Sequence, residues 1–463
     1  MLKIAKSIFR EYDLRGRENK DELNPTSINL IAQSYGTFLR KRGVTNSVVG
    51  HDNRKTSEDF YEAAIDGLRG TGVNVVAIGT VLTPMMYWSQ YHFKTKGGLM
   101  VTASHNPSGW NGLKLAYSYS YTLIGDEVQE IYRVVESGQF ATGKGSFRQE
   151  NINDAYINDL MSRSKLHRGL KVVINTGNGT AGIISPVLLK KFGCSVVEHN
   201  TKLDPSYPHY SPNPARVDMM EDTAKVVVAN KADVGLAVDA DGDRLGVADE
   251  KGNVVWPDRW FILLSRLILK KHPGAKIVFD VKVSEALPED IKAHGGVPIM
   301  WKTGHSYIKQ KLHEEKAAAA GEMSGHIFFV DDFYGFDDAN FAGLKLLEYV
   351  SSQGRPLSKL IEETPYYVST PAYHAPAPDE VKYGVVEKLT EEFKREGYKV
   401  IDINGARVYF EDGDWGLVRA SSNLPALVLR FEAKSEEKLK EIEKIFREKL
   451  KKFPKVGQKW ESA

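Results

Sequence analysis

Short runs of β-branched and other apolar residues alternate along the chain with longer stretches in which apolar residues recur every three or four positions. The first pattern predicts buried strands and the second predicts amphipathic helices, so their alternation indicates α/β layers. In the first part of the chain we expect strands at 47–50, 73–78 and 98–101, with helices at 24–42 and 57–71.

The same alternation occurs twice more. The second α/β unit is expected to contain strands at 171–175 and 195–199, separated by a glycine-rich turn and a helix that runs to Phe192. The third is expected to contain strands at 276–280 and 297–300, with helices from Ser306 and at 338–353.

A smaller unit follows a proline-rich stretch. Residues 365–378 hold four prolines and are interpreted as a linker. Farther on, apolar residues at helical spacing predict a surface-packed helix over 435–453. With softer boundaries near 138–145 and Gly252, the expected domains are 1–148, 149–252, 253–364 and 365–463.

Composition limits the possible classes of protein. The 463 residues predict about three domains at roughly 150 residues each. The net charge of +2 argues against a nucleic-acid partner, because such proteins usually carry a concentrated basic excess. A single cysteine, Cys194, excludes an intramolecular disulfide. The N-terminus fits no signal peptide and the most apolar run, 260–269, is too short to cross a bilayer, so we expect a cytoplasmic protein with no membrane partner.

The most specific pattern is Asp239-Ala-Asp241-Gly-Asp243-Arg244, which follows the apolar run 234–238. Alternate residues of an extended segment share one face, so the three carboxylates converge. Converging carboxylates repel one another unless a cation lies among them, and oxygen-only ligands suit Mg²⁺. The structural alternative is a polar hairpin tip.

Two other functional interpretations of this pattern compete. An EF-hand loop also begins Asp-x-Asp-x-Asp, and Glu250 falls at its twelfth position, but Arg244 occupies the sixth, where glycine is needed. A phosphatase of the haloacid-dehalogenase type would use a strand-end Asp-x-Asp, with Asp239 as phosphoryl acceptor.

A second pattern, Thr102-Ala-Ser104-His105-Asn-Pro107, follows the strand expected at 98–101. A serine beside a histidine at a strand end is a candidate nucleophile, and an Asn-Pro turn is the structural alternative. The chain contains no G-x-S-x-G, which disfavours a hydrolase. Lys114 adds a cation that can neutralise a phosphate.

Two later loops carry polar groups suited to a sugar phosphate. Gly321-Glu-Met-Ser-Gly-His326 places a carboxylate, a hydroxyl and an imidazole on one loop, which suits sugar hydroxyls. Arg419-Ala-Ser-Ser-Asn423, with Arg430 farther on, combines arginine with short donors and suits a phosphate. A solvated turn is the alternative for this loop.

The segment Gly177-Asn-Gly179-Thr-Ala-Gly182 matches a dinucleotide-binding pattern, with Glu198 located 21 residues after Gly177. The other motifs suit phosphate and metal rather than hydride transfer. A tight strand-to-helix turn is therefore the favoured interpretation.

In their order along the chain, these motifs resemble the α-D-phosphohexomutase superfamily, most closely its bacterial phosphomannomutase/phosphoglucomutase members. The resemblance begins at Phe9–Gly16 and spans nearly the whole chain. The other matching segments are 102–107, 239–244, 279–282, 301–305, 321–326, 419–421 and 427–433.

The resemblance implies three similar mixed α/β domains and a smaller C-terminal α+β domain, related to the TATA-binding-protein fold, around a central cleft. It implies a phosphoserine at Ser104 and one Mg²⁺ held by Ser104, Asp239, Asp241 and Asp243. The residues implied to bind substrate are Tyr12, Lys282, His305, Glu322, Ser324, His326, Arg419, Ser421, Ser422, Asn423 and Arg430.

The implied reaction interconverts hexose 1-phosphate and hexose 6-phosphate through a hexose 1,6-bisphosphate, which also serves as activator. Arg244, Lys114 and Lys282 are expected to neutralise phosphate charge. The proton of the attacking hydroxyl is expected to pass to one of Lys114, Arg15, His105 and His326. Closure by the last domain is expected to retain the intermediate, and the partners are small-molecule sugar phosphates, with the chain a monomer or small homo-oligomer.

Two positions bear on the substrate. Arg419-Ala-Ser-Ser-Asn-Leu424 departs from the Arg-x-Ser-Asn-Thr or Arg-Pro-Ser-Gly-Thr that is usual in this family, which leaves the phosphate contacts open. Met323 favours mannose and glucose phosphates, because phosphoglucosamine mutases tend to have glutamine there. The alternatives are a phosphoglucosamine mutase, a sugar-phosphate phosphatase that uses Asp239, and a binding module without turnover.

Overall fold

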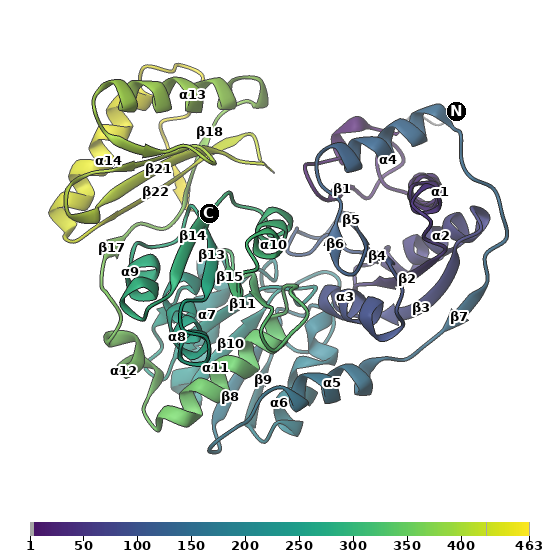
Figure 1. The fold of residues 1–463 in the computed structure, drawn as a ribbon, viewed down its shortest axis with the longest axis horizontal. Helices are drawn as coiled ribbons and strands as arrows, with labels where there is room; N and C mark the ends of the chain where they lie inside the picture. Colours follow the sequence, from purple (N-terminus) through teal and green to yellow (C-terminus); the bar gives the residue numbers. More distant parts are fainter. Residues whose placement is uncertain (1–3, 423, 463) are drawn as a thin grey trace. The chain divides into compact units, whose positions relative to one another are not determined.

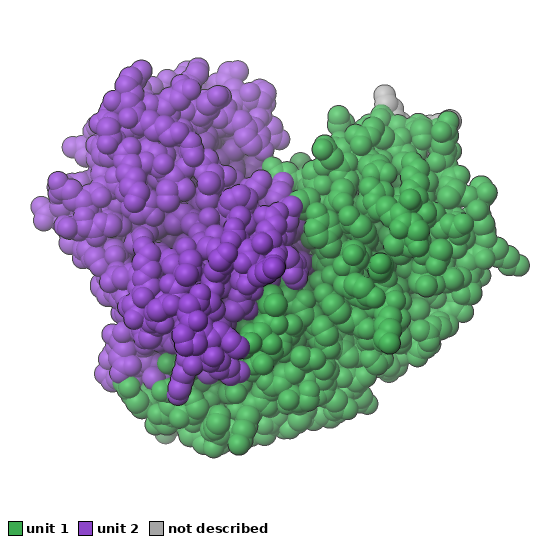
Figure 2. All heavy atoms as spheres, viewed as in Figure 1, with its two compact units in different colours: residues 1–255, 324–358 green, residues 256–323, 359–463 purple. Residues whose placement is uncertain are grey.

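The computed structural model describes residues 4–422 and 424–462. The chain forms two compact units: unit 1 comprises residues 1–255 and 324–358, and unit 2 comprises residues 256–323 and 359–463 (Figure 2). The third predicted domain, 253–364, is therefore divided between the two units.

The first sheet of unit 1 is mixed, with strand order β1-β5-β4-β2-β3-β7 and β6 paired with β5 (Figure 1). Helices α1, α2 and α4 share one apolar core with this sheet, and α3 packs against β2 and β4. Because helices cover β2 and β4, these strands are buried throughout almost their whole length, which explains their apolar sequence. The bounds are β1 Leu14–Arg17, β2 Asn46–His51, β3 Asn74–Thr80, β4 Gly97–Val101, β5 Trp110–Tyr117, β6 Tyr121–Thr122, β7 Phe147–Gln149, α1 Pro25–Lys41, α2 Ser57–Gly70, α3 Thr83–His92 and α4 Asp126–Ser137.

The second sheet of unit 1 has strand order β12-β11-β10-β8-β9. The helix predicted between the glycine-rich turn and Phe192 is confirmed: a short 3-10 turn at Thr180–Ile183 precedes a helix that runs from Ser185 to Lys191 and is capped by Phe192. Helix α11 packs against β10 and β11, which places residues 324–358 in unit 1. The bounds are β8 Lys171–Asn175, β9 Ser195–His199, β10 Val234–Val238, β11 Leu245–Asp249, β12 Val254–Val255, β16 Ile327–Phe329, α5 Asn153–Ser162, α6 Ser185–Lys191, α7 Val217–Asn230 and α11 Ala339–Gln353.

Unit 2 contains three parallel strands in the order β14-β13-β15 and a mainly antiparallel C-terminal sheet in the order β19-β20-β21-β22-β18-β23, with β17 paired to β22. Helices α13 and α14 share the core of the C-terminal sheet. The bounds are β13 Lys276–Asp280, β14 Val297–Trp301, β15 Ala319–Gly321, β17 Val368–Ser369, β18 Tyr373–Pro376, β19 Lys399–Ile401, β20 Ala406–Tyr409, β21 Trp415–Ala420, β22 Ala426–Ala433, β23 Glu461–Ser462, α8 Pro257–Lys271, α9 Ala286–Ala293, α10 His305–Glu314, α12 Leu357–Glu362, α13 Asp379–Arg395 and α14 Glu436–Leu450.

The stretch 365–378, interpreted as a linker, contains regular structure. Strands β17 and β18 lie within it and both pair with β22 in the C-terminal sheet. Pro376 ends β18, and its carbonyl accepts a hydrogen bond from the Gly457 N–H at 2.7 Å. A proline at the end of a strand removes only a terminal donor, so the proline content of this segment is compatible with strands.

Within the described ranges 4–422 and 424–462, no helix combines the length and the apolar character needed to cross a bilayer.

Candidate active site

Ser104 lies in the turn between β4 and β5, in a left-handed backbone conformation. Its φ is 49°, which is uncommon for a residue with a side chain. The Ser104 N–H donates to Thr102 Oγ1 at 2.8 Å, and the residue is almost fully buried. Such a conformation costs roughly 1–3 kcal/mol, so the surrounding structure must impose it. Residues 102–109 are called the Ser104 loop below.

Asp239, Asp241 and Asp243 lie in the loop between β10 and β11, and residues 239–244 are called the acidic loop below. All three aspartates are completely buried, and their carboxylate oxygens lie within 4.8 Å of one another. Gly242, with φ 80°, allows the tight turn, and Asp239 Oδ1 accepts the N–H groups of Asp243 and Arg244 at 3.0 and 3.1 Å. The convergence predicted from the alternating pattern is confirmed.

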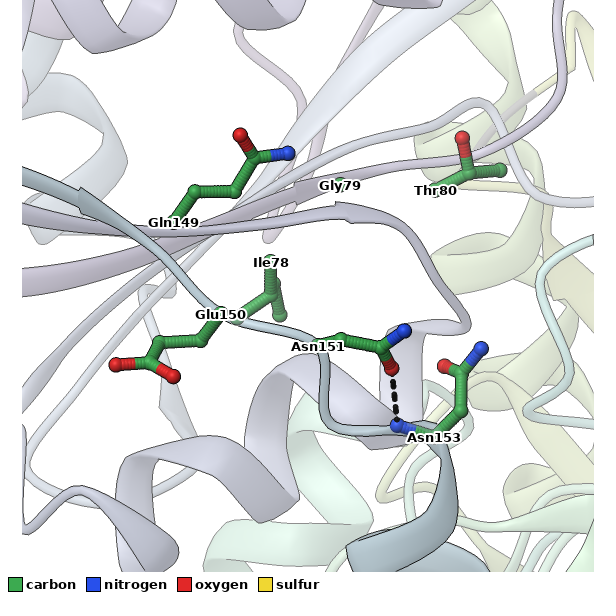
Figure 3. A pocket seen from close by; sticks show the side chains of 7 residues that line it. All are labelled: Ile78, Gly79, Thr80, Gln149, Glu150, Asn151 and Asn153. Carbon is green, nitrogen blue, oxygen red and sulfur yellow. Dashed lines mark hydrogen bonds between the residues drawn. The ribbon is translucent and has the colours of Figure 1, made fainter.

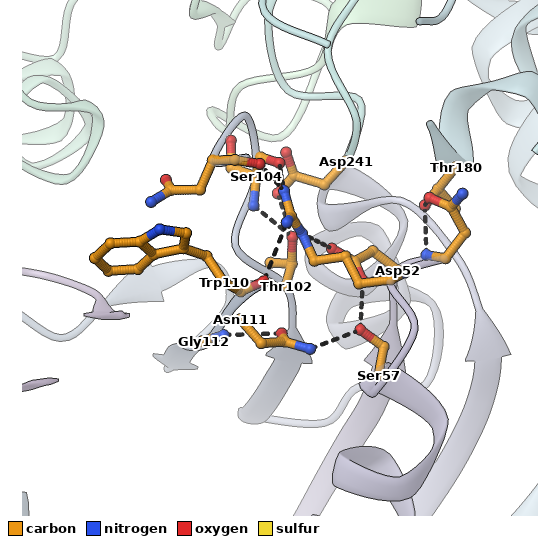
Figure 4. Close-up of polar contacts among 12 residues, drawn as sticks. Asp52, Ser57, Thr102, Ser104, Trp110, Asn111, Gly112, Thr180 and Asp241 are labelled. Atoms are coloured by element: carbon orange, nitrogen blue, oxygen red, sulfur yellow. Dashed lines mark hydrogen bonds and ion pairs between the residues drawn. The ribbon is translucent and has the colours of Figure 1, made fainter. Parts of the chain in front are cut away.

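The two loops meet at the serine hydroxyl. Ser104 Oγ is 3.1 Å from Asp239 Oδ2 and 3.1 Å from His105 Nδ1. Thr102 Oγ1 donates to Asp241 Oδ2 at 3.3 Å (Figure 4). The candidate nucleophile and the candidate metal ligands therefore form one buried cluster within unit 1.

Lys114 of β5 places a cation in this cluster. Its Nζ is 3.0 Å from Asp241 Oδ2 and also contacts Asp243 Oδ2. Burial alone would lower the pKa of Lys114, but the carboxylates outweigh it and hold the pKa well above its usual value. Burial, followed by repulsion from Asp243 and Asp241, raises the pKa of Asp239 well above its usual value. Burial would also raise the pKa of Asp241, but Lys114 and a hydrogen bond from Thr83 hold it below its usual range.

The acidic cluster fits a metal ion. Asp241 Oδ1 and Asp243 Oδ1 are buried, and no residue in the described part of the chain donates a hydrogen bond to either oxygen. Asp243 Oδ1 lies 3.7 Å from His326 Nδ1. Buried carboxylate oxygens without donors are costly unless a cation accompanies them, and a set of hard oxygen ligands suits a divalent cation of the Mg²⁺ type.

His326 connects Arg244 of the acidic loop with Asp337. His326 Nδ1 lies 2.8 Å from Asp337 Oδ2, and Arg244 Nε donates to His326 Nε2 at 2.9 Å. Since arginine only donates, Nε2 is the acceptor and we assign the ring proton to Nδ1. Two predicted catalytic residues, His326 and Arg244, are thus fixed beside the carboxylates.

Three more predicted residues belong to the same unit. Burial, followed by Arg244 and Arg15, lowers the pKa of His105 well below its usual value, so its imidazole is neutral at pH 7. Arg15 of β1 donates to the Thr102 carbonyl at 2.8 Å, in the Ser104 loop. Tyr12 is half-buried and lies two residues before β1.

Unit 2 contains a second group of acidic and basic residues, around the end of β15. Glu322 is buried and accepts the Gly304 N–H at 2.6 Å. Burial, followed by Asp280, raises the pKa of Glu322 to about 7, although Lys282 and His305 oppose this. Lys282 Nζ lies 3.4 Å from Asp280 Oδ2, and His305 is buried at the start of α10. Three of the predicted substrate-binding residues, Glu322, Lys282 and His305, therefore belong to one group.

The predicted sugar-recognition loop, 321–326, contains a boundary between the two units. Met323 is the last residue of one segment of unit 2, and Ser324 is the first residue of the following segment of unit 1. Ser324 is half-buried.

The predicted phosphate loop follows β21 in unit 2. Arg419 Nη2 is 3.4 Å from Ser422 Oγ, and the Leu424 N–H donates to Ser421 Oγ at 3.2 Å. Arg419 and Ser421 are largely buried, whereas Ser422 is half-buried. Asn423 lies outside the described residues. The three described members of this set, Arg419, Ser421 and Ser422, are close together.

Two cations beside these groups bind the chain itself. Arg430 Nη2 pairs with Asp258 at 2.9 Å, and its Nη1 donates to the Lys282 carbonyl. The guanidinium is therefore occupied by protein groups, and a role in substrate binding stays a prediction. Sequence reasoning missed Lys382, whose Nζ donates to the Ser421 carbonyl at 2.6 Å and so fixes the phosphate loop.

Sequence reasoning also missed Asp52 and Arg54, which support the main chain of the Ser104 loop. Figure 4 shows Asp52 and Ser57 beside the strand that carries Asn111. The polar sequence Asp52-Asn-Arg54 directly follows the buried strand β2, and the other candidate motifs were recognised by the same position after a strand. The position of these polar residues directly after a strand is the signal that could have identified them.

The glycine-rich turn at 177–182 serves close packing of the chain. A Cβ at Gly179 would lie 2.5 Å from Ala240 Cα, and a Cβ at Gly182 would lie 1.9 Å from the Thr201 carbonyl oxygen. Gly177 has φ 54°. These contacts support the interpretation of a tight turn, which here packs directly against the acidic loop.

A separate pocket of about 350 Å³ lies beside the end of β3 (Figure 3). It is lined by Ile78, Gly79, Thr80, Gln149, Glu150, Asn151 and Asn153. None of the predicted site residues lines this pocket, and the lining carries one ionisable side chain, Glu150.

The fold and the site of unit 1 define a class of protein. A buried serine hydroxyl in contact with a carboxylate cluster and a lysine, placed at strand ends of α/β domains, is the arrangement of a phosphoryl-transfer enzyme. The EF-hand interpretation is wrong, because the acidic loop connects two antiparallel strands.

Comparison with known proteins gives the family. Models of phosphoglucomutase/phosphomannomutase α/β/α domains I, II and III match residues 6–142, 154–252 and 256–367, and the model of the C-terminal domain matches 376–449. The chain therefore belongs to the phosphoglucomutase/phosphomannomutase family, and it is a hexose-phosphate mutase. The resemblance drawn from the sequence and the predicted fold class are confirmed.

Individual relatives agree over the full length. The chain is 39% identical to a phosphomannomutase/phosphoglucomutase of Pseudomonas syringae, over 97% of this chain and 96% of that protein. It is 36% identical to a phosphoglucomutase of Neisseria gonorrhoeae, over 98% and 99%. A crystal structure of a family protein from Burkholderia thailandensis superposes with a TM-score of 0.91 at 37% identity, covering 97% of this chain and 98% of that one.

Proposed function

We propose that this mutase transfers phosphoryl groups through a phosphoserine at Ser104 and interconverts the 1- and 6-phosphates of mannose and glucose. The observation that carries the proposal is the position of Ser104 Oγ, which is buried at 3.1 Å from Asp239 in a cluster that also contains Lys114. The names of the relatives, phosphomannomutase/phosphoglucomutase and phosphoglucomutase, support both sugars.

The proposed metal is one Mg²⁺ per chain, held by Asp239, Asp241, Asp243 and an oxygen of phosphorylated Ser104. When bound, the ion would neutralise negative charge on the phosphoryl oxygens. The two buried carboxylate oxygens without hydrogen-bond donors support this assignment.

In the first proposed step, the free hydroxyl of the hexose monophosphate attacks the phosphorus of phosphoserine 104. The bond between phosphorus and Ser104 Oγ breaks, the hydroxyl proton passes to a base, Ser104 Oγ takes up a proton, and a hexose 1,6-bisphosphate forms. The bisphosphate then turns around, and Ser104 Oγ gives up its proton as it accepts the other phosphate, while the oxygen of the product hydroxyl takes up a proton. Arg244 and Lys114 stabilise the charge of the transferring group.

The proton acceptor is one of Lys114, Arg15, His105 and His326. His105 is the group in contact with Ser104 Oγ, and its lowered pKa leaves a neutral imidazole that can accept a proton at pH 7. Lys114 is held protonated by its carboxylate partners, so it is the better proton donor.

The residues of unit 2 are proposed to bind substrate. Glu322, with Ser324 from the following segment, binds sugar hydroxyls; Lys282 and His305 bind the charged end of the substrate, as does Tyr12 from unit 1. Arg419, Ser421, Ser422, Asn423 and Arg430 bind the phosphate that is not transferred. Met323 favours mannose and glucose over glucosamine, and phosphoglucosamine mutase activity is the alternative within the family.

A phosphatase that uses Asp239 as phosphoryl acceptor is the alternative from another class. It is less well supported, because Asp239 Oδ1 accepts two backbone N–H groups and Oδ2 accepts the Ser104 hydroxyl. Such a carboxylate acts as a fixed acceptor rather than as an exposed nucleophile.

The proposal is tested with glucose 1-phosphate, Mg²⁺ and a trace of glucose 1,6-bisphosphate in a coupled assay, repeated with mannose 1-phosphate. We expect formation of the 6-phosphates and one phosphate on Ser104 by peptide mass spectrometry. Ser104→Ala should lose turnover, and Ser108→Ala, an exposed serine of the same loop, should keep it. Release of inorganic phosphate by a hydroxylamine-labile phosphoenzyme would support the phosphatase instead, and binding without turnover would contradict both enzymes.

We further propose that 1–148, 149–252, 253–364 and 365–463 are the four domains, and that the chain works in the cytoplasm as a monomer or small homo-oligomer. The sole cysteine, Cys194, is buried, and burial raises the pKa of its thiol to about 12. A single buried cysteine forms no intramolecular disulfide, so the fold does not depend on an oxidising compartment.

A further inference from the structure

In the segment that follows β2, the side chain of Arg54 binds main-chain carbonyls of the Ser104 loop. Arg54 Nη2 donates to the Ser104 carbonyl at 2.5 Å and to the Asn106 carbonyl at 2.6 Å. Its Nη1 donates to the carbonyls of Pro107 and Trp110, each at 3.0 Å. A single guanidinium thus holds four main-chain carbonyls, three of them in the Ser104 loop and the fourth at Trp110, the first residue of β5.

Arg54 is itself anchored by Asp52. Both side chains are almost completely buried, with Arg54 Nε 3.2 Å from Asp52 Oδ2. Asp52 Oδ1 accepts the Arg54 N–H at 3.0 Å and the Ser57 hydroxyl at 2.5 Å, and Asn111 Nδ2 donates to Ser57 Oγ at 3.1 Å (Figure 4). The guanidinium therefore has little freedom to move.

Asn53, between these two residues, binds Asn178 and Thr180 in the glycine-rich turn, which packs against the acidic loop. Its N–H donates to Thr180 Oγ1 at 2.9 Å, and its Nδ2 donates to the Asn178 carbonyl at 3.0 Å. The Thr180 N–H in turn donates to the Ala240 carbonyl at 2.8 Å, within the acidic loop. Three consecutive residues therefore connect the two loops that meet at Ser104 Oγ and Asp239.

We propose that Asp52, Asn53 and Arg54 form a positioning segment that sets the location of Ser104 Oγ relative to the acidic loop. This inference rests on the proposed function, in which Ser104 carries the transferred phosphoryl group. The segment contains positioning residues and not catalytic residues, because Arg54 reaches main-chain carbonyls rather than the serine hydroxyl.

The backbone of Ser104 shows why such a device is needed. A left-handed serine relaxes toward other conformations unless its peptide groups are held, and rotation of the peptide would move Oγ away from Asp239. Reacting atoms must be placed within a fraction of an ångström, and a displacement of about 1 Å costs about 10²-fold in rate. Four hydrogen bonds from a planar, permanently charged group provide that restraint.

Arg54→Lys is the decisive variant. It keeps a cation beside Asp52 but replaces the planar fork by one ammonium, which cannot hold four carbonyls. We expect kcat for glucose 1-phosphate to fall by about 10²-fold with KM unchanged. In rapid-quench mixing of the phosphorylated enzyme with substrate, transfer of phosphate from Ser104 should slow by the same factor.

Arg163→Lys is the matched control. Arg163 is also in unit 1 and also combines a carboxylate, Asp159, with a loop carbonyl, that of Asp332 at 2.8 Å, without contacting the Ser104 loop. It should lose some thermal stability and keep wild-type kcat and wild-type transfer rate. If Arg54→Lys matches this control in transfer rate, the inference is overturned.

Asn53→Ala keeps the inference testable if Arg54→Lys does not fold. Asn53 is half-buried, so its truncation is tolerated more easily. We expect a lower transfer rate at saturating Mg²⁺ with unchanged KM, and an unchanged rate would contradict the inference. Wild-type enzyme without phosphate on Ser104 would instead contradict the proposed function, so the two failures are distinguishable.

Discussion

The acidic loop of unit 1 and the group around Glu322 in unit 2 both bury more carboxylates than cations, but they balance charge differently. In unit 1, Lys114 contacts two of three buried aspartates, and two further carboxylate oxygens fit a metal ion. In unit 2, Lys282 is 3.4 Å from Asp280, and Glu322 has its pKa raised to about 7. A bound cation would complete the charge balance of the first group, whereas the second is balanced by a proton, so the second should respond to pH near neutrality.

The largest expected effect comes from removing the cation of unit 1. Lys114→Met leaves buried carboxylates without their partner, which should lower the free energy of unfolding by about 3–5 kcal/mol in the absence of divalent ions. Urea unfolding in EDTA measures this. Lys345→Met is the control, because Asp332 and Glu348 beside Lys345 are more exposed and its loss should be smaller. Equal losses would show that the acidic loop does not depend on Lys114.

The next effect tests the metal itself. Mg²⁺ at about 100 times its dissociation constant should stabilise the wild-type chain by about 2.7 kcal/mol, because only the folded state assembles the three aspartates. Thermal unfolding with and without Mg²⁺ measures the gain. Asp241→Asn should reduce the gain and Glu322→Gln should leave it unchanged. A gain that depends on Glu322 would contradict the comparison.

The pH response of unit 2 should be somewhat smaller. Glu322 takes up its proton more readily in the folded state, so its contribution is fully present below about pH 4.5 and is lost as the pH rises toward about 7. Glu322→Gln should remove about 2 kcal/mol of the decline between pH 5 and 7, measured by urea unfolding at each pH. Burial also raises the pKa of Asp338, in unit 1, to about 7, so its share of the decline should remain in this variant.

Asp338→Asn separates stability from binding in that experiment. Like Glu322→Gln, it should reduce the decline in stability between pH 5 and 7, but it should leave the KM for glucose 1-phosphate and the pH dependence of that KM unchanged. Glu322→Gln should change both the pH dependence of stability and the KM. If neither variant changes the pH dependence of unfolding, the pKa values of the two carboxyls are not raised.

The smallest effect concerns the phosphate loop. Lys382→Met removes the donor to the Ser421 carbonyl, so the loop loses its fixed shape while Ser104 and the acidic loop stay intact. We expect KM to rise about tenfold, the value of one charge-assisted hydrogen bond, with kcat nearly unchanged. Steady-state kinetics measures both constants. Lys359→Met, an exposed lysine in unit 2 that pairs with Glu362, is the control and should change neither.

Local patterns were sufficient for elements whose neighbours are close in sequence. Strands β8, β9 and β13 occupy the predicted residues, since their apolar runs are bounded by turns. The convergence of the three aspartates also follows from local alternation. Resemblance to a family added the pairing of Ser104 with these aspartates, which no local pattern predicts because the residues are 135 positions apart.

Elements whose role depends on distant partners were not predictable in this way. The proline content of 365–378 indicated a linker, but β22, more than 40 residues later, supplies the hydrogen-bond partners that make strands of it. Arg54 carried no visible signal beyond its place after a strand, because its four acceptors are main-chain carbonyls of residues 104–110. A sequence motif identifies side chains, whereas Arg54 contacts main-chain carbonyls, which every residue has.

The left-handed conformation of Ser104 also limits what evolution can place there. Threonine offers the same hydroxyl chemistry, but its branched Cβ is strongly disfavoured at φ 49°. Asparagine and aspartate tolerate that backbone but supply no hydroxyl to phosphorylate. If Ser104 carries the phosphate as proposed, the backbone therefore restricts the choice of carrier to serine before reactivity does, and an exchange for threonine would require a different turn.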